Sequence, residues 1–252
     1  MNEYTAFASL YDTFMEDVPY EKWYEEIEGF FKTFKKPNIT GKIAELGCGT
    51  GNMTRLLKKD GTNVIGVDIS SEMLTVAKKK TDEEGLDILY VMQDFRELEL
   101  GEKVDAIVSV CDCMNYVTEY SELKEVFKRV ANSLVSGGLF IFDVNTLHKF
   151  RDVLSDNSYS QTTENSACTW ENFFDEQTRI NEYYTNFFVL DEKTGQYIRN
   201  EEFHYERGYT VEEIKKALED FEILGIYDEK DFSEGDENAE RLFFVARENK
   251  NE

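Results

Sequence analysis

The sequence predicts an α/β fold with a seven-stranded, mostly parallel sheet, an antiparallel hairpin at one edge of it, and a small inserted antiparallel β-sheet. Three observations support this prediction. Apolar, strand-like segments alternate with amphipathic helical segments between residues 42 and 144. Residues 158–207 are instead rich in aromatic residues, Thr and Asn, and the last two strand-like segments have no helical stretch between them.

The N-terminal part is expected to be helical, because residues 20–34 carry apolar side chains at helical spacing before Pro37 and Gly41 break the chain. We expect residues 1–40 to form a cover on the main domain. The alternating part follows, with right-handed crossovers between parallel strands. Strands are predicted at 42–46, 63–68, 86–94, 104–110 and 139–144, and helices from about 51 to 61, after Ser70 or Ser71, and at 121–138.

The inserted sheet is expected within residues 146–208. Its strand-like segments are 168–176, 180–192 and 196–207, with a hairpin turn at Gly195. Thr210 and Glu213 have the spacing of a capping box, so a helix begins there and runs to about Phe221. Segments 221–228 and 241–247 then form the edge hairpin. The predicted main domain therefore comprises residues 41–145 and 209–252, and the insertion forms a lid.

Composition excludes several classes of function. The chain has 252 residues, and 28 basic against 52 acidic residues give a net charge of −24. An acidic surface repels phosphate backbones, which argues against a nucleic-acid partner. No apolar run approaches the ~20 residues that span a bilayer, and the first residues do not have the pattern of a signal peptide. Four scattered cysteines and two histidines predict a cytoplasmic protein with reduced thiols and no metal site. The oligomeric state is left open.

A glycine-rich turn, ELGCGTGNM at residues 45–53, lies between the first predicted strand and a helix. Its glycines at 47, 49 and 51 allow the backbone to approach a ligand. A dinucleotide turn has the spacing G-x-G-x-x-G, and here Asn52 stands where its third glycine would be. A P-loop requires a Lys, which is missing after Gly51. The turn therefore favours a ligand other than a phosphate.

Two acidic residues end the next two strands. Asp68 ends the second strand, where a carboxylate can accept hydrogen bonds from both hydroxyls of a ribose. Asp94 ends the third strand and is followed by Phe95, a pair that could hold an adenine by its amino group and its face.

Together, Glu45-Leu-Gly-Cys-Gly-Thr-Gly, Asp68 and Gln93-Asp94-Phe95 resemble the class I S-adenosylmethionine-dependent methyltransferases. The resemblance covers essentially the whole chain, including the final hairpin. Tyr4-x-x-Phe7-Ala8-x-x-Tyr11-Asp12 and Val18-Pro19-Tyr20-x-x-Trp23 are similar to a bacterial subgroup with an N-terminal helical cover and an inserted β-sheet lid. The resemblance implies a Rossmann-like methyltransferase domain, a transferase activity and S-adenosylmethionine as the cofactor.

The resemblance also implies which residues contact the cofactor. Backbone atoms of the turn would lie beside its methionine part, Ile69 and Met73 would flank the adenine, and aromatic rings of the cover would face the sulfonium. The full expected set is Tyr11, Trp23, Glu45, Gly47, Cys48, Gly49, Asp68, Ile69, Met73, Asp94, Phe95 and Cys111. Core packing remains an alternative for Tyr11, Trp23 and Met73, and capping of nearby amides remains one for Glu45.

The acceptor is expected where the fourth and fifth strands end, at the cofactor crevice of an open α/β sheet. An N-P-P-Y-like sequence, which marks attack by a planar amide or base nitrogen, is absent from VCDCMNY at 110–116. The catalytic residue is unknown, with Asp112 and His204 as candidate bases. Candidates for acceptor binding are Asn115, Tyr116, Asn145 and Arg207, with Asp143 and Arg179 as further polar possibilities.

The leading interpretation is an enzyme that transfers a methyl group in line to an unidentified small-molecule acceptor. Methylation of a protein or RNA is one alternative, and a non-catalytic S-adenosylmethionine-binding module is another. A nicotinamide-dependent dehydrogenase fits the sheet but not the glycine spacing.

Overall fold

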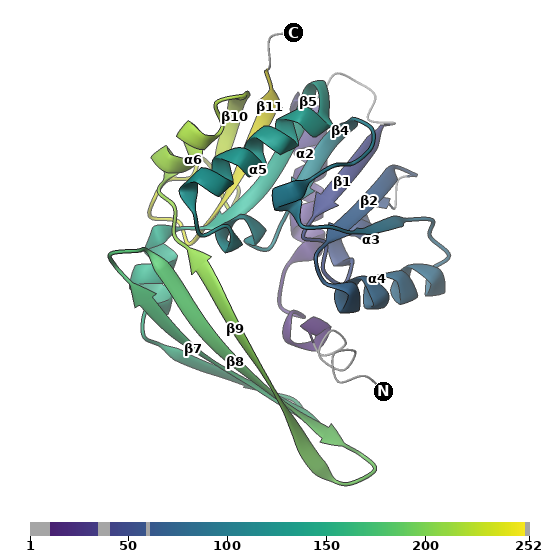
Figure 1. The fold of residues 1–252 in the computed structure, drawn as a ribbon, viewed down its shortest axis with the longest axis vertical. Coiled ribbons are helices and arrows are strands. Elements are labelled where there is room, and N and C mark those ends of the chain that lie inside the picture. The colour runs from purple at the N-terminus through teal and green to yellow at the C-terminus, as the bar shows by residue number, and fades with distance from the viewer. Residues whose placement is uncertain (1–10, 35–40, 59–60, 250–252) are drawn as a thin grey trace.

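The main sheet has the predicted architecture. A computed structural model describes residues 11–34, 41–58 and 61–249. It contains a seven-stranded sheet in the order β10-β11-β5-β4-β1-β2-β3 (Figure 1). The strands are β1 (Lys42–Leu46), β2 (Asn63–Asp68), β3 (Leu89–Met92), β4 (Val104–Ser109), β5 (Leu134–Asn145), β10 (Phe221–Asp228) and β11 (Arg241–Glu248). All neighbours are parallel except β11, which runs antiparallel to both β5 and β10, so the predicted edge hairpin is confirmed.

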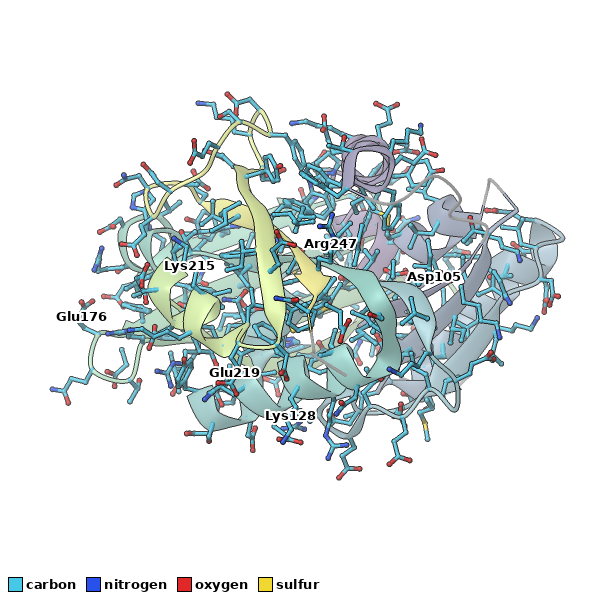
Figure 2. All side chains as sticks on the ribbon, turned by 90° about the horizontal axis from the view of Figure 1, so that it is seen from above. Asp105, Lys128, Glu176, Lys215, Glu219 and Arg247 are labelled. Carbon is cyan, nitrogen blue, oxygen red and sulfur yellow. The ribbon has the colours of Figure 1, made fainter. Side chains whose placement is uncertain are left out.

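Helices cover both faces of this sheet. They are α2 (Tyr20–Phe34), α3 (Asn52–Lys58), α4 (Ser71–Glu83), α5 (Tyr120–Ser133) and α6 (Val211–Ala217). Seen from above, the sheet lies between α2 and α5, and Lys128 and Glu219 mark the side of α5 and α6 (Figure 2). Along β5, Phe140 and Phe142 pack on the α5 side, whereas Ile141 packs on the α2 side. This alternation is what a strand buried on both faces requires.

The prediction for residues 121–138 was partly wrong. The helix ends at Ser133, and Leu134 already pairs with Val104 in the sheet. Leu134 is fully buried, and the register between β4 and β5 shifts after this pair. Gly137 has a φ of 75° inside the strand. Gly137 therefore lies at an irregularity within a strand and, contrary to the prediction from the sequence, does not end the helix. The third predicted strand is also shorter, because only Leu89–Met92 pairs with β2.

The insertion is a separate four-stranded antiparallel sheet. Its strands, in order across the sheet, are β6 (Ser158–Thr162), β7 (Ser166–Asp175), β8 (Ile180–Asp191) and β9 (Gln196–Arg207). Three of them match the predicted segments, and β6 was not predicted. The long β8–β9 hairpin reaches away from the main sheet (Figure 1). A parallel bridge between Thr146 and Tyr209 closes the base of the insertion. The domain boundaries at 146 and 208 stay a prediction.

Short helices complete the chain: η1 (Phe95–Glu97), η2 (Cys113–Tyr116) and η3 (Lys149–Leu154). The predicted capping box of Thr210 and Glu213 is present at the start of α6. Ser70, rather than Ser71, caps α4. Tyr4, Phe7 and Ala8 of the N-terminal motif lie outside the described residues. Across the described ranges, no helix combines the length and apolarity needed to cross a membrane.

Candidate active site

The glycine turn after β1 depends on a left-handed backbone. Gly47, Gly49 and Gly51 have φ values of 69°, 51° and 79°. A Cβ at Gly51 would lie 2.6 Å from the Tyr90 hydroxyl and 3.1 Å from Cβ of Ala77, so this glycine is also needed for packing. A Cβ at Gly49 would meet nothing within 4 Å. The backbone at Gly49 is therefore the part of the turn that is open to a ligand.

Asp68 joins the glycine turn to the end of β2. Its Oδ2 accepts a hydrogen bond from the Gly49 amide at 2.7 Å, and its Oδ1 accepts one from the Ser70 amide at 2.8 Å. Burial raises the pKa of this carboxyl, and the two amides oppose that shift. A carboxylate has about four lone-pair sites, so each oxygen can still accept a hydrogen bond from a ligand. Beside it, Ile69 is 64% exposed, and Met73 on α4 is half-buried.

Three predicted residues at the turn have polar atoms that hydrogen-bond within the protein. The amides of Gly47 and Cys48 both donate to the Val67 carbonyl, at 2.8 Å and 3.0 Å. Glu45 is 2% exposed and accepts a hydrogen bond from the Thr54 hydroxyl of α3. Burial raises the pKa of Glu45 to about 8. The hydrogen bond of Glu45 thus connects β1 to α3. Its expected contact with the cofactor stays a prediction.

Asp94 and Phe95 lie at the carboxyl end of β3, as predicted, but both have partners in the protein. Asp94 caps η1 by accepting from the Arg96 amide at 2.9 Å, and its Oδ2 lies 2.6 Å from the Arg96 guanidinium. The side-chain hydrogen bond from Arg96 lowers the pKa of Asp94. Phe95 packs against the core cluster on the α5 side. A role for this pair toward an adenine is not tested by these contacts.

The N-terminal segment is anchored on the glycine turn. Asp12 accepts hydrogen bonds from the Thr50 hydroxyl at 2.6 Å and the Asn52 amide group at 3.1 Å. Asp12 also forms an ion pair with Lys80 of α4. Tyr11 is partly buried. Burial, followed by charges on the loop after β4 and on Asp68, raises the pKa of Tyr11. Tyr11 therefore lies between the end of β2 and the loop after β4.

Trp23 occupies a different environment from Tyr11. It is 2% exposed and packs edge-on against Phe243 with ring centroids 5.5 Å apart. Its indole nitrogen donates to Glu229 at 3.2 Å, and the Arg241 guanidinium lies 5.3 Å from its ring centroid. These contacts give Trp23 the core-packing role that the sequence left open. Its predicted contact with the cofactor stays untested.

The loop after β4 holds a buried ionic cluster. Cys111 and Asp112 have φ values of 63° and 52°, a sparsely populated conformation for residues other than glycine. The Asp112 amide donates to Asp143 Oδ2 at 3.1 Å. Arg241 of β11 lies 2.6 Å from Asp112 Oδ1 and also pairs with Asp143. Arg241 lowers the pKa of Asp112 against the effect of burial, whereas burial raises that of Asp143 to about 6.

Asn115, Asn145 and Arg207 connect three segments. The Asn115 amide group donates to the carbonyls of Asn145 at 2.9 Å and Arg207 at 2.8 Å, and its Oδ1 accepts from the Asn145 amide at 2.9 Å. The Arg207 guanidinium donates to the Thr118 carbonyl at 3.1 Å and lies 3.4 Å from Glu213. These contacts give Asn115 and Arg207 structural roles, and acceptor binding by any of the three stays a prediction.

Tyr116 and His204, by contrast, meet at the base of the insertion. The Tyr116 hydroxyl lies 2.5 Å from the Tyr183 hydroxyl and 3.3 Å from His204 Nδ1. Sequence reasoning missed two residues nearby, the buried Glu206 and the largely buried Arg241. A charged residue on a predicted buried strand is the one local signal that could have identified Arg241.

The parallel sheet, the glycine turn after β1 and the carboxylate at the end of β2 define an α/β fold of the nucleotide-binding type. Residues 43–138 match the methyltransferase domain family. A protein of Bacillus subtilis strain 168 named "Putative methyltransferase YqeM" is 32% identical over 252 residues, covering 98% of each chain. One of Geobacillus sp. strain WCH70 is 30% identical over 246 residues, covering 97% of this chain and 99% of the relative.

A solved structure extends the match to the whole fold. The S-adenosylmethionine-dependent methyltransferase from Clostridium acetobutylicum ATCC 824 is 33% identical, with a TM-score of 0.88 over 99% of this chain and 100% of that one. The chain belongs to the class I S-adenosylmethionine-dependent methyltransferases. It is an enzyme with S-adenosylmethionine as cofactor, so the predicted family, fold, activity and cofactor are confirmed.

Two glycines of the turn allow the cost of lost packing to be separated from the cost of backbone strain. Gly49→Ala and Gly51→Ala both place a side chain at positive φ, which costs about 1–2 kcal/mol. Gly51→Ala also forces a Cβ against Tyr90 and Ala77, which adds about 1–3 kcal/mol. We expect Gly51→Ala to reduce the free energy of unfolding more than Gly49→Ala in urea titrations. Equal losses for the two variants would contradict the packing described for the turn.

The buried Glu45 carboxyl predicts how the free energy of unfolding depends on pH. Its folded pKa of about 8 lies above its ordinary value of 4.5, so the folded protein retains a proton that the unfolded chain releases between these values. Stability therefore falls as pH rises through this window, by at most about 1.4 kcal/mol per pH unit. Glu45→Gln should flatten that slope in urea unfolding, and the exposed Glu99→Gln should leave it unchanged. An unaltered slope in Glu45→Gln would refute the buried, protonated carboxyl.

Proposed function

We propose that the enzyme binds S-adenosylmethionine at the carboxyl ends of β1, β2 and β4 and methylates a small molecule held beneath the inserted sheet. The observation that carries this proposal is the Asp68 carboxylate, which two backbone amides hold in place while each of its oxygens keeps capacity for a ribose hydroxyl. The open space at Gly49 supports the approach of a ligand to the turn.

The remaining cofactor contacts follow the family resemblance. In this proposal Ile69 and Met73 flank the adenine, because an exposed isoleucine beside a ribose-binding carboxylate offers an apolar surface. Asp94 lies next to the adenine, and its carboxylate takes the adenine amino group in exchange for one of the hydrogen bonds that Arg96 makes to both of its oxygens. The backbone of Gly47, Cys48, Gly49 and Cys111 lies along the methionine part, and Tyr11 contributes an aromatic face to the sulfonium.

The chemistry requires positioning above all. When bound, the cofactor supplies an activated methyl group and a good leaving group. The protein then holds the acceptor nucleophile in line, which can be worth about 7–11 kcal/mol of the barrier. The N-terminal cover and the insertion can exclude water, since the rings of Phe14 and Phe187 lie 5.7 Å apart and join them.

A small acceptor fits an enclosed site better than a protein or RNA does. Tyr116 of η2 and Tyr183 of β8 are hydrogen-bonded across the boundary between main sheet and insertion, which restricts access by a broad substrate. The net charge of −24 opposes RNA. We assign residues 1–40 to the cover, 41–145 and 209–252 to the methyltransferase domain, and 146–208 to the lid. The four free cysteines are in keeping with a cytoplasmic enzyme.

Calorimetric titration with S-adenosylmethionine tests the proposed site. Native protein should bind in the micromolar range. Asp68→Asn should weaken binding about 10- to 100-fold, because the amide nitrogen of Asn cannot accept one of the two ribose hydrogen bonds, and a hydrogen bond to a charged group contributes about 1.5–3 kcal/mol. Asp87→Asn, which alters an exposed carboxylate before β3, is the matched control and should bind as the native protein does.

Equal affinity in Asp68→Asn and native protein would overturn the assignment of the ribose site. Turnover of the cofactor with a panel of small acceptors separates an enzyme on small molecules from one that acts on proteins or RNA, because only the former forms S-adenosylhomocysteine with the panel.

A further inference from the structure

A continuous chain of hydrogen bonds leads from the buried interior to the surface of the insertion. The Tyr183 hydroxyl is hydrogen-bonded to Glu206 Oε1 at 3.1 Å and lies 2.5 Å from the Tyr116 hydroxyl. The Tyr116 hydroxyl lies 3.3 Å from His204 Nδ1, and His204 Nε2 lies 3.0 Å from Glu202 Oε2. Glu206 is 2% exposed, whereas the Glu202 side chain is 29% exposed. The chain therefore has a buried end at Glu206 and reaches solvent from Tyr116, which is 42% exposed, through to Glu202.

Strand geometry brings these groups together. Glu202, His204 and Glu206 alternate along β9, so all three lie on one face of the inserted sheet. Tyr183 is the cross-strand partner of His204 on β8, and their rings stack with centroids 4.6 Å apart. Tyr116 reaches the same face from η2 in the main domain. The chain thus forms only where the insertion rests on the loop after β4.

The buried end of the chain is a pair of carboxyl groups. Glu206 interacts with Asp112 through a side-chain hydrogen bond. Burial and the nearby Asp112 charge raise the pKa of Glu206, whereas Arg241 lowers that of Asp112 against burial. Two adjacent carboxyl groups do not both ionise readily, so the pair holds a single proton. The other titratable or charged groups that interact with the pair are Arg241, Lys149, Asp143, Tyr116, Tyr183, Tyr11, Cys111 and Cys113.

This buried end adjoins the proposed cofactor crevice. Charges on both Asp68 and Asp112 act on Tyr11, and both also act on Cys113 of η2. Oδ1 of Asp143 is buried and has no hydrogen-bond partner among the described residues. An unmet buried acceptor is costly, so the cluster has capacity for a donor group of a ligand. The carboxyl pair therefore lies close to the proposed cofactor crevice, at the loop after β4.

We propose that the Asp112–Glu206 pair accepts the proton of an acceptor N–H or O–H, and that Tyr183, Tyr116 and His204 conduct a proton from the pair to the surface. The inference rests on the proposed function and specifies its substrate class, namely small amines or alcohols whose nucleophile loses a proton. An acceptor such as a thioether or a tertiary amine has no proton to transfer and would not use this chain.

For an amine acceptor, methyl transfer and proton transfer occur together. The nitrogen lone pair forms the bond to the methyl carbon, and the bond from that carbon to the cofactor sulfur breaks with its electron pair on sulfur. The amine proton passes to Asp112 while Glu206 releases its own proton to Tyr183. Tyr183 passes a proton to Tyr116, Tyr116 passes one to His204 Nδ1, and the proton on Nε2 leaves to Glu202 or water. The pair again holds one proton.

Nitrogen NMR of the imidazoles tests the chain without an acceptor. The sequence has two histidines, His148 and His204, so His148→Gln assigns both signals. Neutral His204 should be the Nε2–H form with Nδ1 as an acceptor. Tyr183→Phe retains the ring that stacks on His204, so a shift of the Nδ1 signal reports the lost hydroxyl, with His148 unchanged. An Nδ1–H form, or no response to Tyr183→Phe, would overturn the relay.

The pH dependence of cofactor affinity tests the proton on the pair. S-adenosylmethionine carries a sulfonium charge that S-adenosylhomocysteine lacks, so the cation should bind relatively tighter as the pair loses its proton. We expect the ratio of the dissociation constant of S-adenosylmethionine to that of S-adenosylhomocysteine to fall about three- to tenfold as pH rises through the titration of the pair. Because a glutamine at this position has no proton to release in this range, Glu206→Gln should abolish the pH dependence of the ratio that comes from the pair. Glu201→Gln, on the opposite face of β9, should retain it.

The outcomes separate this inference from the proposed function. A ratio with the same pH dependence in native protein and Glu206→Gln would overturn the relay and leave cofactor binding intact. Failure of native protein to bind either compound would instead refute the proposed cofactor site. Tyr183→Phe provides the same comparison if Glu206→Gln does not fold.

Discussion

The attachment of Asp68 to two backbone amides is the constraint on which the candidate site depends. The Gly49 amide belongs to the turn after β1 and the Ser70 amide to the start of α4, so one carboxylate sets the distance between two loops. Asp12 then anchors the N-terminal segment on the same turn. The proposed cofactor crevice is thus bounded by groups that hydrogen bonds already fix, which would lower the ordering cost of binding.

Arg241 has the corresponding role on the proposed acceptor side. It neutralises Asp112 and Asp143 in a largely buried position, and its guanidinium also lies over the ring of Trp23. Removal of one member of such a cluster leaves an uncompensated buried charge. The loop after β4 therefore retains its left-handed backbone, and Tyr116 is held where the insertion can contact it. The proposed cofactor side and the proposed acceptor side meet where the Cys113 thiol donates to the Gly47 carbonyl at 3.6 Å.

Much of this organisation could be predicted from the sequence. The βα alternation, the glycine turn, Asp68 and the capping box at Thr210 are local patterns, and each was found in its expected place. The pairing of Arg241 with Asp112 spans 129 residues and depends on the register of β11 against β5, which has no local signal. The end of α5 was mispredicted because a glycine pair is compatible with an irregular strand as well as with a helix stop. The structural roles of Asn115 and Arg207 likewise come from tertiary contacts.

The most direct test of the central claim is a crystal structure of the enzyme with S-adenosylhomocysteine. The account predicts that both ribose hydroxyls donate to the oxygens of Asp68, while this carboxylate retains its hydrogen bonds from the Gly49 and Ser70 amides. A nucleoside bound away from the end of β2, or a glycine turn that separates from Asp68 to admit it, would contradict the account.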